Sequence, residues 1–201
     1  MVYKTLQTQP DRFRFFDGYH HIRNESDQDD LVFTYRDEKI TVQIKSLDSL
    51  RADKSFSCGS SEGFDAKNNC NNGTKAYNSD LYIFAYVNLN EDDGKIIREI
   101  HETWNSCEDE GFYKTDVEQA NYQRIQESVR KDTMVLDNWT FYVTTPETVS
   151  TMIANNKIAI SKLDISIESK LTYKTDAEGL CLVVARACVR IVQGKKNEID
   201  Q

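Results

Sequence analysis

Residues 30–46, DLVFTYRDEKITVQIKS, decide the fold of this chain. Two runs within this stretch, Leu31–Arg36 and Ile40–Ser46, are rich in Val, Ile, Thr, Phe and Tyr, the residue types that favour strands. They flank a short polar connection at Asp37–Lys39. Strand-like runs on both sides of a short polar segment predict a β-hairpin.

Polar side chains gather at one end of the predicted hairpin. Asp30 precedes the first strand, and Gln43 and Lys45 lie two positions apart on the second. Because successive side chains of a strand point to opposite faces, Gln43 and Lys45 share one face. We therefore expect three polar groups to meet in one place. Alternating Thr, Gln and Lys is also typical of an ordinary solvated antiparallel strand, so the pattern alone leaves both interpretations open.

The order of these residues resembles the PD-(D/E)xK nuclease superfamily, which includes restriction endonucleases and Holliday-junction resolvases. Its motif is an acidic residue, a hairpin, then Glu or Gln, an apolar residue and Lys, and VQIKS at 42–46 is similar to the variants with Gln. The resemblance implies that Asp30, Gln43 and the backbone carbonyl of Ile44 bind Mg²⁺. It also implies that Asp30, Gln43 and Lys45 are the catalytic residues, with Lys45 assisting the attacking water.

These residue types suit the implied chemistry. Mg²⁺ prefers oxygen ligands and keeps several waters, so one carboxylate, one amide and one carbonyl suffice once a phosphate adds another ligand, and Mn²⁺ is a candidate substitute. Gln43 adds no charge, which predicts weak metal binding that the substrate assists. Asp27 and Asp29 compete with Asp30 for the acidic role. Glu25 is the candidate accessory carboxylate, although a solvated loop residue is the simpler interpretation of it.

Two later regions extend the predicted sheet. The nearly continuous apolar run Leu81–Leu89 predicts a central strand buried on both faces. Asp92–Gly94 is a turn signal before a further strand at Lys95–Ile100. Residues 139–165 resemble the late strand, loop and short helix of the nuclease family. The resemblance covers residues 30–165 and implies a restriction endonuclease-like α/β fold, a mixed central β-sheet flanked by helices.

Weaker signals mark the remaining elements. Residues 1–29 show no convincing helical period, although Arg12–Phe16 alternates like a strand. Thr145 followed by Pro146 predicts the start of a helix. The region Asp176–Val192 suits a helix by its apolar spacing and a strand by its β-branched residues, and we favour the helix.

The long stretch at residues 47–79 is crowded with Ser, Gly, Asn and Asp. Long functional loops often lie beside a rigid catalytic scaffold, and amide side chains can read base edges. Lys67, Asn69 and Lys75 are therefore the candidate substrate-binding residues. A flexible connection accounts for the same composition, so the sequence does not separate the two interpretations.

Length and composition predict one compact domain, residues 1–201, which is 39% hydrophobic and 29% charged. Its expected parts are the hairpin core (30–46), the continuing sheet core (80–165) and a C-terminal helix or strand extension (166–201). No run approaches the roughly twenty apolar residues that span a bilayer, and the N-terminus lacks the apolar core of a signal peptide. We therefore expect a cytoplasmic protein that does not contact a membrane.

Cysteine usage and charge refine this expectation. The five cysteines are odd in number and contain no CxxC pair, so we expect reduced thiols. A net charge of −8 argues against a general affinity for DNA. Residues 157–196 nevertheless carry eight basic and four acidic side chains, which predicts a local basic surface for phosphate contacts.

The sequence therefore predicts a Mg²⁺-dependent endonuclease of restriction type that hydrolyses DNA phosphodiester bonds. DNA is the expected partner, and a homodimer is a candidate assembly. Two alternatives remain: a catalytically inactive binding or regulatory module with the nuclease fold, and a nuclease subunit completed by a partner chain. Neutral Gln43, the short segment before the hairpin and the acidic net charge favour these alternatives.

Overall fold

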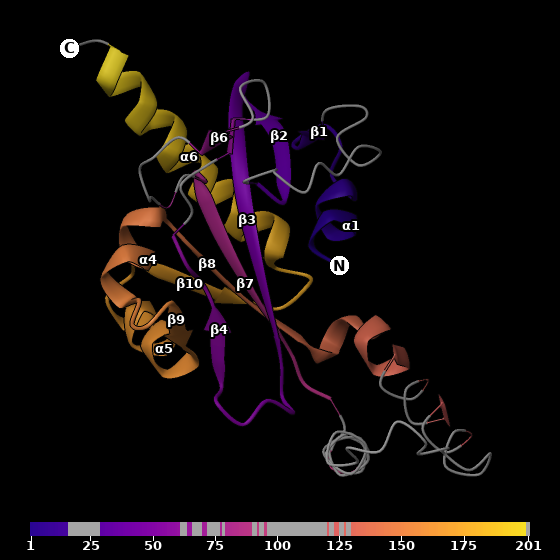
Figure 1. The fold of residues 1–201 in the computed structure, drawn as a ribbon. Coiled ribbons are helices and arrows are strands. Elements are labelled where there is room, and N and C mark those ends of the chain that lie inside the picture. The colour runs from indigo at the N-terminus through magenta and orange to yellow at the C-terminus, as the bar shows by residue number, and fades with distance from the viewer. Residues whose placement is uncertain are drawn as a thin grey trace.

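The computed structural model describes residues 1–15, 29–60, 64–65, 70–71, 77, 79–89 and 130–199, together with six single positions between 92 and 127. These residues form a mixed α/β fold around a six-stranded sheet of order β1-β2-β3-β7-β8-β10 (Figure 1). The elements, in chain order, are α1 (Val2–Gln7), β1 (Arg14–Phe15), β2 (Leu31–Tyr35), β3 (Glu38–Asp48), β4 (Ser55–Ser57), β5 (Phe64–Asp65), β6 (Cys70–Asn71), β7 (Leu81–Val87), the 3₁₀ helix η1 (Leu136–Asn138), β8 (Trp139–Thr144), α4 (Pro146–Met152), β9 (Lys157–Ala159), α5 (Ile160–Glu168), β10 (Thr172–Thr175) and α6 (Leu180–Ile199).

The predicted hairpin is confirmed as β2 and β3, which pair antiparallel from Leu31↔Val42 to Tyr35↔Glu38. Its turn differs from the expected Asp37–Lys39 connection. Arg36 and Asp37 both adopt positive φ angles, 49° and 65°, and they alone connect the strands. Two residues with positive φ match the type I′ turn, whose twist suits the strands of a hairpin. The second strand therefore begins two residues earlier than the sequence indicated.

The centre of the sheet is the parallel pair β3 and β7, which runs from Val42↔Leu81 to Asp48↔Val87. The next strand, β8, pairs antiparallel with β7, so the sheet is mixed. Six of the seven residues of β7 are buried. The prediction of a central strand buried on both faces is confirmed, because helices and short strands cover both sides of it.

The two faces of the sheet carry separate apolar clusters. Ile83 of β7 and Val42 of β3 pack with residues of α6 and α1 on one face. Phe84 and Leu47 pack on the other face with residues of α4, α5, β4 and β9. Figure 1 shows α6 passing behind the sheet, whereas α4 and α5 lie away from α6.

Several expectations for the flanking regions need correction. The N-terminal segment contains a helix, α1, whose buried Val2 and Leu6 pack against the cluster on the α6 side. Residues 166–201 contain the strand β10, which belongs to the main sheet, and the helix α6, which covers one face. The expected strand at Lys95–Ile100 is wrong at Lys95, which is helical, as is Asp92 in the expected turn. The rest of that strand lies outside the described residues.

Helices α4 and α6 confirm two predictions. Pro146 occupies the first helical position of α4 after Thr145, as the helix-start signal indicated. The ambiguous region 176–192 forms most of the 20-residue helix α6, so the apolar spacing outweighed the β-branched content. None of the helices that the structure describes has the length and apolar character needed to cross a membrane.

Candidate functional site

The residues that the nuclease resemblance singled out lie together at one end of the hairpin. We call Asp30, Gln43, the carbonyl of Ile44 and Lys45 the hairpin site. Leu31 pairs with Val42, so Asp30 lies directly across from Gln43 at the point where β2 begins. Cross-strand neighbours share a face, which brings the Asp30 carboxylate to the side of β3 that carries Gln43.

Neutral donors hold the Asp30 carboxylate. Its Oδ2 accepts a hydrogen bond from the side-chain amide of Gln43 and a second from the backbone N–H of Ile44, at 2.7 Å. The Asp30 N–H in turn donates to the carbonyl of Val42 at 2.9 Å. The carboxylate therefore accepts the hydrogen bond that the backbone of β2 would accept if that strand continued. Hydrogen bonds that involve the backbone of Asp30 and of β3 fix its position.

The Ile44 carbonyl completes a set of oxygen donors. In an extended strand the N–H and the C=O of one residue point to the same side. Because the Ile44 N–H points at Asp30, its carbonyl points to the same edge, past the start of β2. One carboxylate, one amide and one carbonyl thus border a single place, as the resemblance implies for a metal site.

Lys45 continues the face that Gln43 begins. It is half-buried and lies beside Phe84 of β7, whose ring packs in the cluster with Phe56. Within the described part of the chain, no carboxylate lies within 4 Å of the Lys45 ammonium. Its charge acts on the buried thiol of Cys58, where it opposes the rise in pKa that burial causes. Among the described residues, Lys45 is therefore a cation of the hairpin site without a carboxylate partner.

Aromatic residues and a thiol border the same face. Tyr82 of β7 is the register neighbour of Gln43, and its ring meets that of Tyr77 edge to face, with centroids 6.1 Å apart. Burial, with the nearby Cys58, raises the pKa of Tyr82 to about 12. The phenol of Tyr82 consequently stays protonated at neutral pH. Sequence reasoning missed Cys58 as a neighbour of Lys45, since 13 positions separate them.

The rival Asp29 has a partner of its own. Asp29 Oδ1 accepts a hydrogen bond from the Ser79 hydroxyl at 2.5 Å, and burial raises the pKa of Asp29. The carboxylate that contacts Gln43 and Ile44 is that of Asp30. Asp27 and the proposed accessory residue Glu25 lie outside the described residues.

Asp80 forms a structural link beside the hairpin site. Its Oδ2 accepts hydrogen bonds from the N–H and the hydroxyl of Thr41, at 2.9 and 3.2 Å. Its Oδ1 forms an ion pair with Lys195 of α6 at 2.8 Å, and Lys195 also donates to the carbonyl of Lys39. Asp80 thereby ties the start of β7 to β3 and to α6, so its charge is already compensated.

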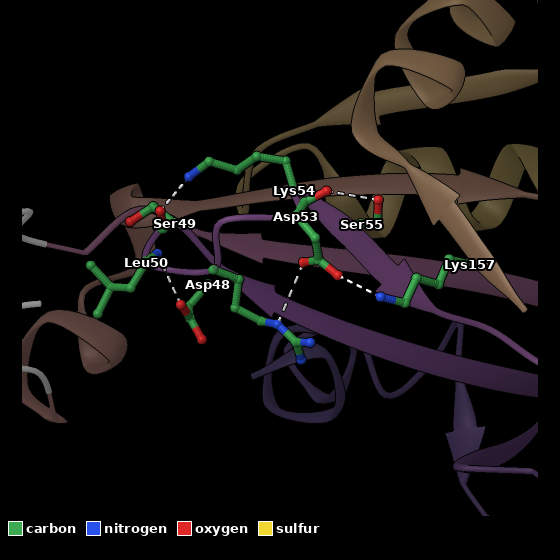
Figure 2. A network of polar contacts seen from close by, with 8 residues as sticks. Asp48, Ser49, Leu50, Asp53, Lys54, Ser55 and Lys157 are labelled. Atoms are coloured by element: carbon green, nitrogen blue, oxygen red, sulfur yellow. Dashed lines mark hydrogen bonds and ion pairs between the residues drawn. The ribbon is translucent and has the colours of Figure 1, made fainter. Parts of the chain in front are cut away.

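The expected basic surface is partly neutralised. Three lysines of the 157–196 region form ion pairs: Lys157 with Asp53, Lys174 with Asp164 and Lys195 with Asp80. Figure 2 shows the first of these, between Asp53 and Lys157 of β9. The Asp53 carboxylate also forms an ion pair with Arg51, at 3.7 Å. The same view shows the loop that joins β3 to β4, where Leu50 N–H donates to Asp48 and Lys54 reaches the Ser49 carbonyl.

The candidate substrate-binding residues Lys67, Asn69 and Lys75 lie outside the described residues. The loop that carries them is less irregular than its composition indicated, because Ser55–Ser57 forms β4 and pairs with β9. Cys58, which follows β4, is a free buried thiol, as are Cys181 and Cys188. The expectation of reduced thiols is confirmed for these three.

The donor set fits a hard divalent cation better than a soft one. Within the described residues, no three Asp, Glu, His or Cys side chains form a group that could hold a metal ion. The ligands available at the hairpin site are instead one carboxylate, one amide and one carbonyl, all oxygen donors, which Mg²⁺ and Mn²⁺ accept. Asp30, Gln43 and Ile44 are thus the residues that could hold such an ion.

Comparisons with known proteins add no relative. No family model matches the chain, and the searches of curated proteins and of solved structures find no significant match. The case for a function therefore rests on the residues of the hairpin site and their geometry.

Proposed function

We propose that this chain is a Mg²⁺-dependent nuclease that hydrolyses DNA phosphodiester bonds at the hairpin site. The observation that carries the proposal is the contact of Asp30 with both Gln43 and the Ile44 backbone. Gln43 and Ile44 are 13 and 14 positions from Asp30, and the pairing register of the hairpin brings them into contact with it. The mixed sheet, covered on both faces, supports assigning the domain to the restriction endonuclease-like folds.

Each residue has a role that its surroundings support. Asp30, Gln43 and the Ile44 carbonyl would hold the cation, which lowers the pKa of a bound water and offsets charge on the phosphate oxygens. Gln43 now directs its amide N–H groups at Asp30, so a half-turn of the amide would present its oxygen instead. Lys45, half-buried and without a carboxylate partner in the described chain, would face the phosphate and stabilise its developing negative charge.

The neutral amide makes the affinity of the site depend on its substrate. A single carboxylate attracts a divalent cation less than two would, so an oxygen of the DNA phosphate has to complete the ligand set. The protein alone should consequently bind Mg²⁺ weakly, and DNA should tighten that binding. This dependence would confine cleavage to the complex with DNA.

One observation favours a second function, a binding module without catalysis. Both hydrogen bonds to Asp30 come from groups of the protein, so the carboxylate is satisfied without a cation. Such a module would bind nucleic acid through the same face and leave the phosphodiester intact. A nuclease subunit completed by a partner chain is the third possibility, and it would bind metal through Asp30 without cleaving alone.

The experiment is a cleavage assay on supercoiled plasmid, linear duplex, single-stranded DNA and RNA, with Mg²⁺, Mn²⁺ or EDTA. The test variants are Asp30→Asn, which keeps the shape of the side chain, and Lys45→Ala. The matched controls are Asp137→Asn and Lys162→Ala, which remove the same charges at exposed positions of η1 and α5. All five proteins are purified identically, and Mn²⁺ binding is measured on each.

We expect metal-dependent cleavage of DNA by the parent and both controls, and a loss of at least about 100-fold in both test variants. Cleavage that persists in Asp30→Asn would place the chemistry elsewhere. Without cleavage by the parent, Mn²⁺ binding that depends on Asp30 would point to the subunit awaiting a partner. Mn²⁺ binding unaffected by Asp30→Asn, again without cleavage, would establish the inactive module.

A further inference from the structure

A hollow lined by arginines lies at the other end of the hairpin from the hairpin site. Its volume is about 610 Å³, and it lies between the hairpin turn, the segment that leads into β1 and one side of α6. Four arginines line it: Arg12, Arg14, Arg36 and Arg186. We call it the arginine pocket. The lining residues come from three separate parts of the sequence, so only the fold brings them together.

We propose that the arginine pocket binds a nucleoside polyphosphate. The charges that line it favour an anion, because the lining has four guanidinium groups and only two carboxylates, those of Asp11 and Asp37. Within the described residues, none of the four arginines forms an ion pair with a carboxylate. Arg36 instead lies over the ring of Tyr35, with its guanidinium carbon 5.6 Å from the ring centre.

Guanidinium groups suit phosphate better than other cations do. Each presents a planar array of N–H donors that binds two phosphate oxygens at once. Several of them around one hollow match several phosphates, and the surplus of positive charge over Asp11 and Asp37 favours a ligand with more than one negative charge. A di- or triphosphate meets that requirement, whereas a single carboxylate does not.

An apolar wall on α6 supplies the second half of the recognition. Leu182, Ala185 and Val189 line the pocket together with Arg186, at the spacing of three and four that places residues on one side of a helix. The Leu182 side chain is half exposed, at 50%, so its apolar surface is available for contact. An apolar surface beside guanidinium groups fits the flat face of a base whose phosphates bind the arginines.

The arginine pocket is distinct from the hairpin site. Asp30 precedes the first residue of β2 and Arg36 follows its last, so the five-residue strand separates them by roughly 17 Å. The inference therefore stands whether or not the hairpin site cleaves DNA. A volume of about 610 Å³ suits one nucleotide and favours a small ligand over a long strand.

The test is calorimetric titration of the full chain in EDTA, which prevents metal-dependent hydrolysis at the hairpin site. The probes are ATP, GTP, adenosine, pyrophosphate and a single-stranded oligonucleotide. The variants are Arg186→Ala, Arg186→Lys and a matched control, Arg190→Ala, which lies one turn further along α6 and contacts Tyr173 rather than the pocket. Circular dichroism verifies that each variant is folded.

We expect ATP or GTP to bind, to lose at least tenfold in affinity in Arg186→Ala and part of that in Arg186→Lys, and to be unaffected by Arg190→Ala. Adenosine should not bind, and added salt should weaken the nucleotide affinity. The inference is overturned if neither nucleotide binds, or if Arg190→Ala weakens binding as much as Arg186→Ala does. Equal affinity for pyrophosphate would remove the role of the apolar wall, and Arg186-dependent binding of the oligonucleotide alone would assign the pocket to a nucleic-acid strand.

Discussion

Asp30 lies across from Gln43 in the middle of β3, Asp53 lies in the loop between β3 and β4, and the two carboxylates have different partners. Asp30 is half-buried and accepts hydrogen bonds from the neutral amide of Gln43 and from a backbone N–H. Asp53 is close to solvent and pairs with two cations, Lys157 at 2.8 Å and Arg51 at 3.7 Å (Figure 2). No cation among the described residues lies within 4 Å of the Asp30 carboxylate.

This difference separates a carboxylate available for a ligand from one used in the structure. The hydrogen bond from Lys157 holds the pKa of Asp53 below its usual value, as expected for a paired surface group. Lys45 lies nearby on the facing strand β3, yet the two side chains form no ion pair. Neutral donors fix the position of the Asp30 carboxylate. The charges of Asp30 and Lys45 therefore remain available to a bound ligand. The comparison predicts that substitutions around Asp30 and around Asp53 affect different properties.

The largest effect should come from the apolar residue that anchors the Asp53 region. Phe56 of β4 is fully buried, and its ring meets that of Phe84 edge to face at 5.1 Å. Phe56→Ala should lower the free energy of unfolding by about 3–5 kcal/mol, because it removes a buried ring and leaves a cavity. Urea unfolding followed by circular dichroism measures this loss, and Asp53→Asn is the comparison. If Asp53→Asn destabilised the protein as much as Phe56→Ala, the ion pairs and not the apolar contact would hold β4 in place.

A smaller effect, of opposite sign with and without metal, should follow Gln43→Glu. Without metal, the variant places two carboxylates side by side and removes the hydrogen bond to Asp30, which should cost about 1–3 kcal/mol. The like-charge pair raises a carboxyl pKa in the folded state, so the folded state binds more protons and the deficit grows as the pH rises above about 4. With Mn²⁺, the second carboxylate should increase the rise in melting temperature above that of the parent.

Gln193→Glu is the matched control for that variant, since Gln193 is exposed on α6. It should change the free energy of unfolding by less than about 0.5 kcal/mol and leave the response to Mn²⁺ unaltered. Equal responses to Mn²⁺ in Gln43→Glu and the parent would show that Gln43 does not contribute to a metal site. The comparison of Asp30 with Asp53 would then describe two structural carboxylates.

The hairpin and its polar end were predictable because they depend on local rules. Residue preference identified both strands, and alternation placed Gln43 and Lys45 on one face, as observed. The turn was misplaced because Arg36 does not favour positive φ as Gly, Asn and Asp do, and the strand pairing imposes that geometry on it. Helix α1 was missed because six residues are too few to establish a period.

The arginine pocket and the ion pairs could not be predicted from spacing. Arg14 and Arg186 are 172 positions apart, and their meeting depends on how α6 crosses the edge of the sheet. Counting charges in the C-terminal region likewise indicated a basic surface, but Lys157 and Lys195 find carboxylates on other elements. Net charge within a segment says little about its field once tertiary contacts pair the charges.

The smallest effect should come from Asp53 itself. Because its pKa is lowered in the folded state, the folded state binds fewer protons than the unfolded state near the usual value of 3.8, so the pairing stabilises the protein at neutral pH and ceases to do so as the pH falls through the folded pKa. Asp53→Asn should therefore lower the melting temperature slightly at pH 7, and this difference should shrink at pH 3 and in 1 M salt. Lys157→Met should have a similar effect, and the double variant should show no further loss because both single variants break the same contact. A difference that persisted at low pH and high salt would mean that the Asp53 side chain acts through hydrogen bonds such as the one from the Ser55 backbone N–H, and that even the exposed carboxylate is held by geometry more than by charge.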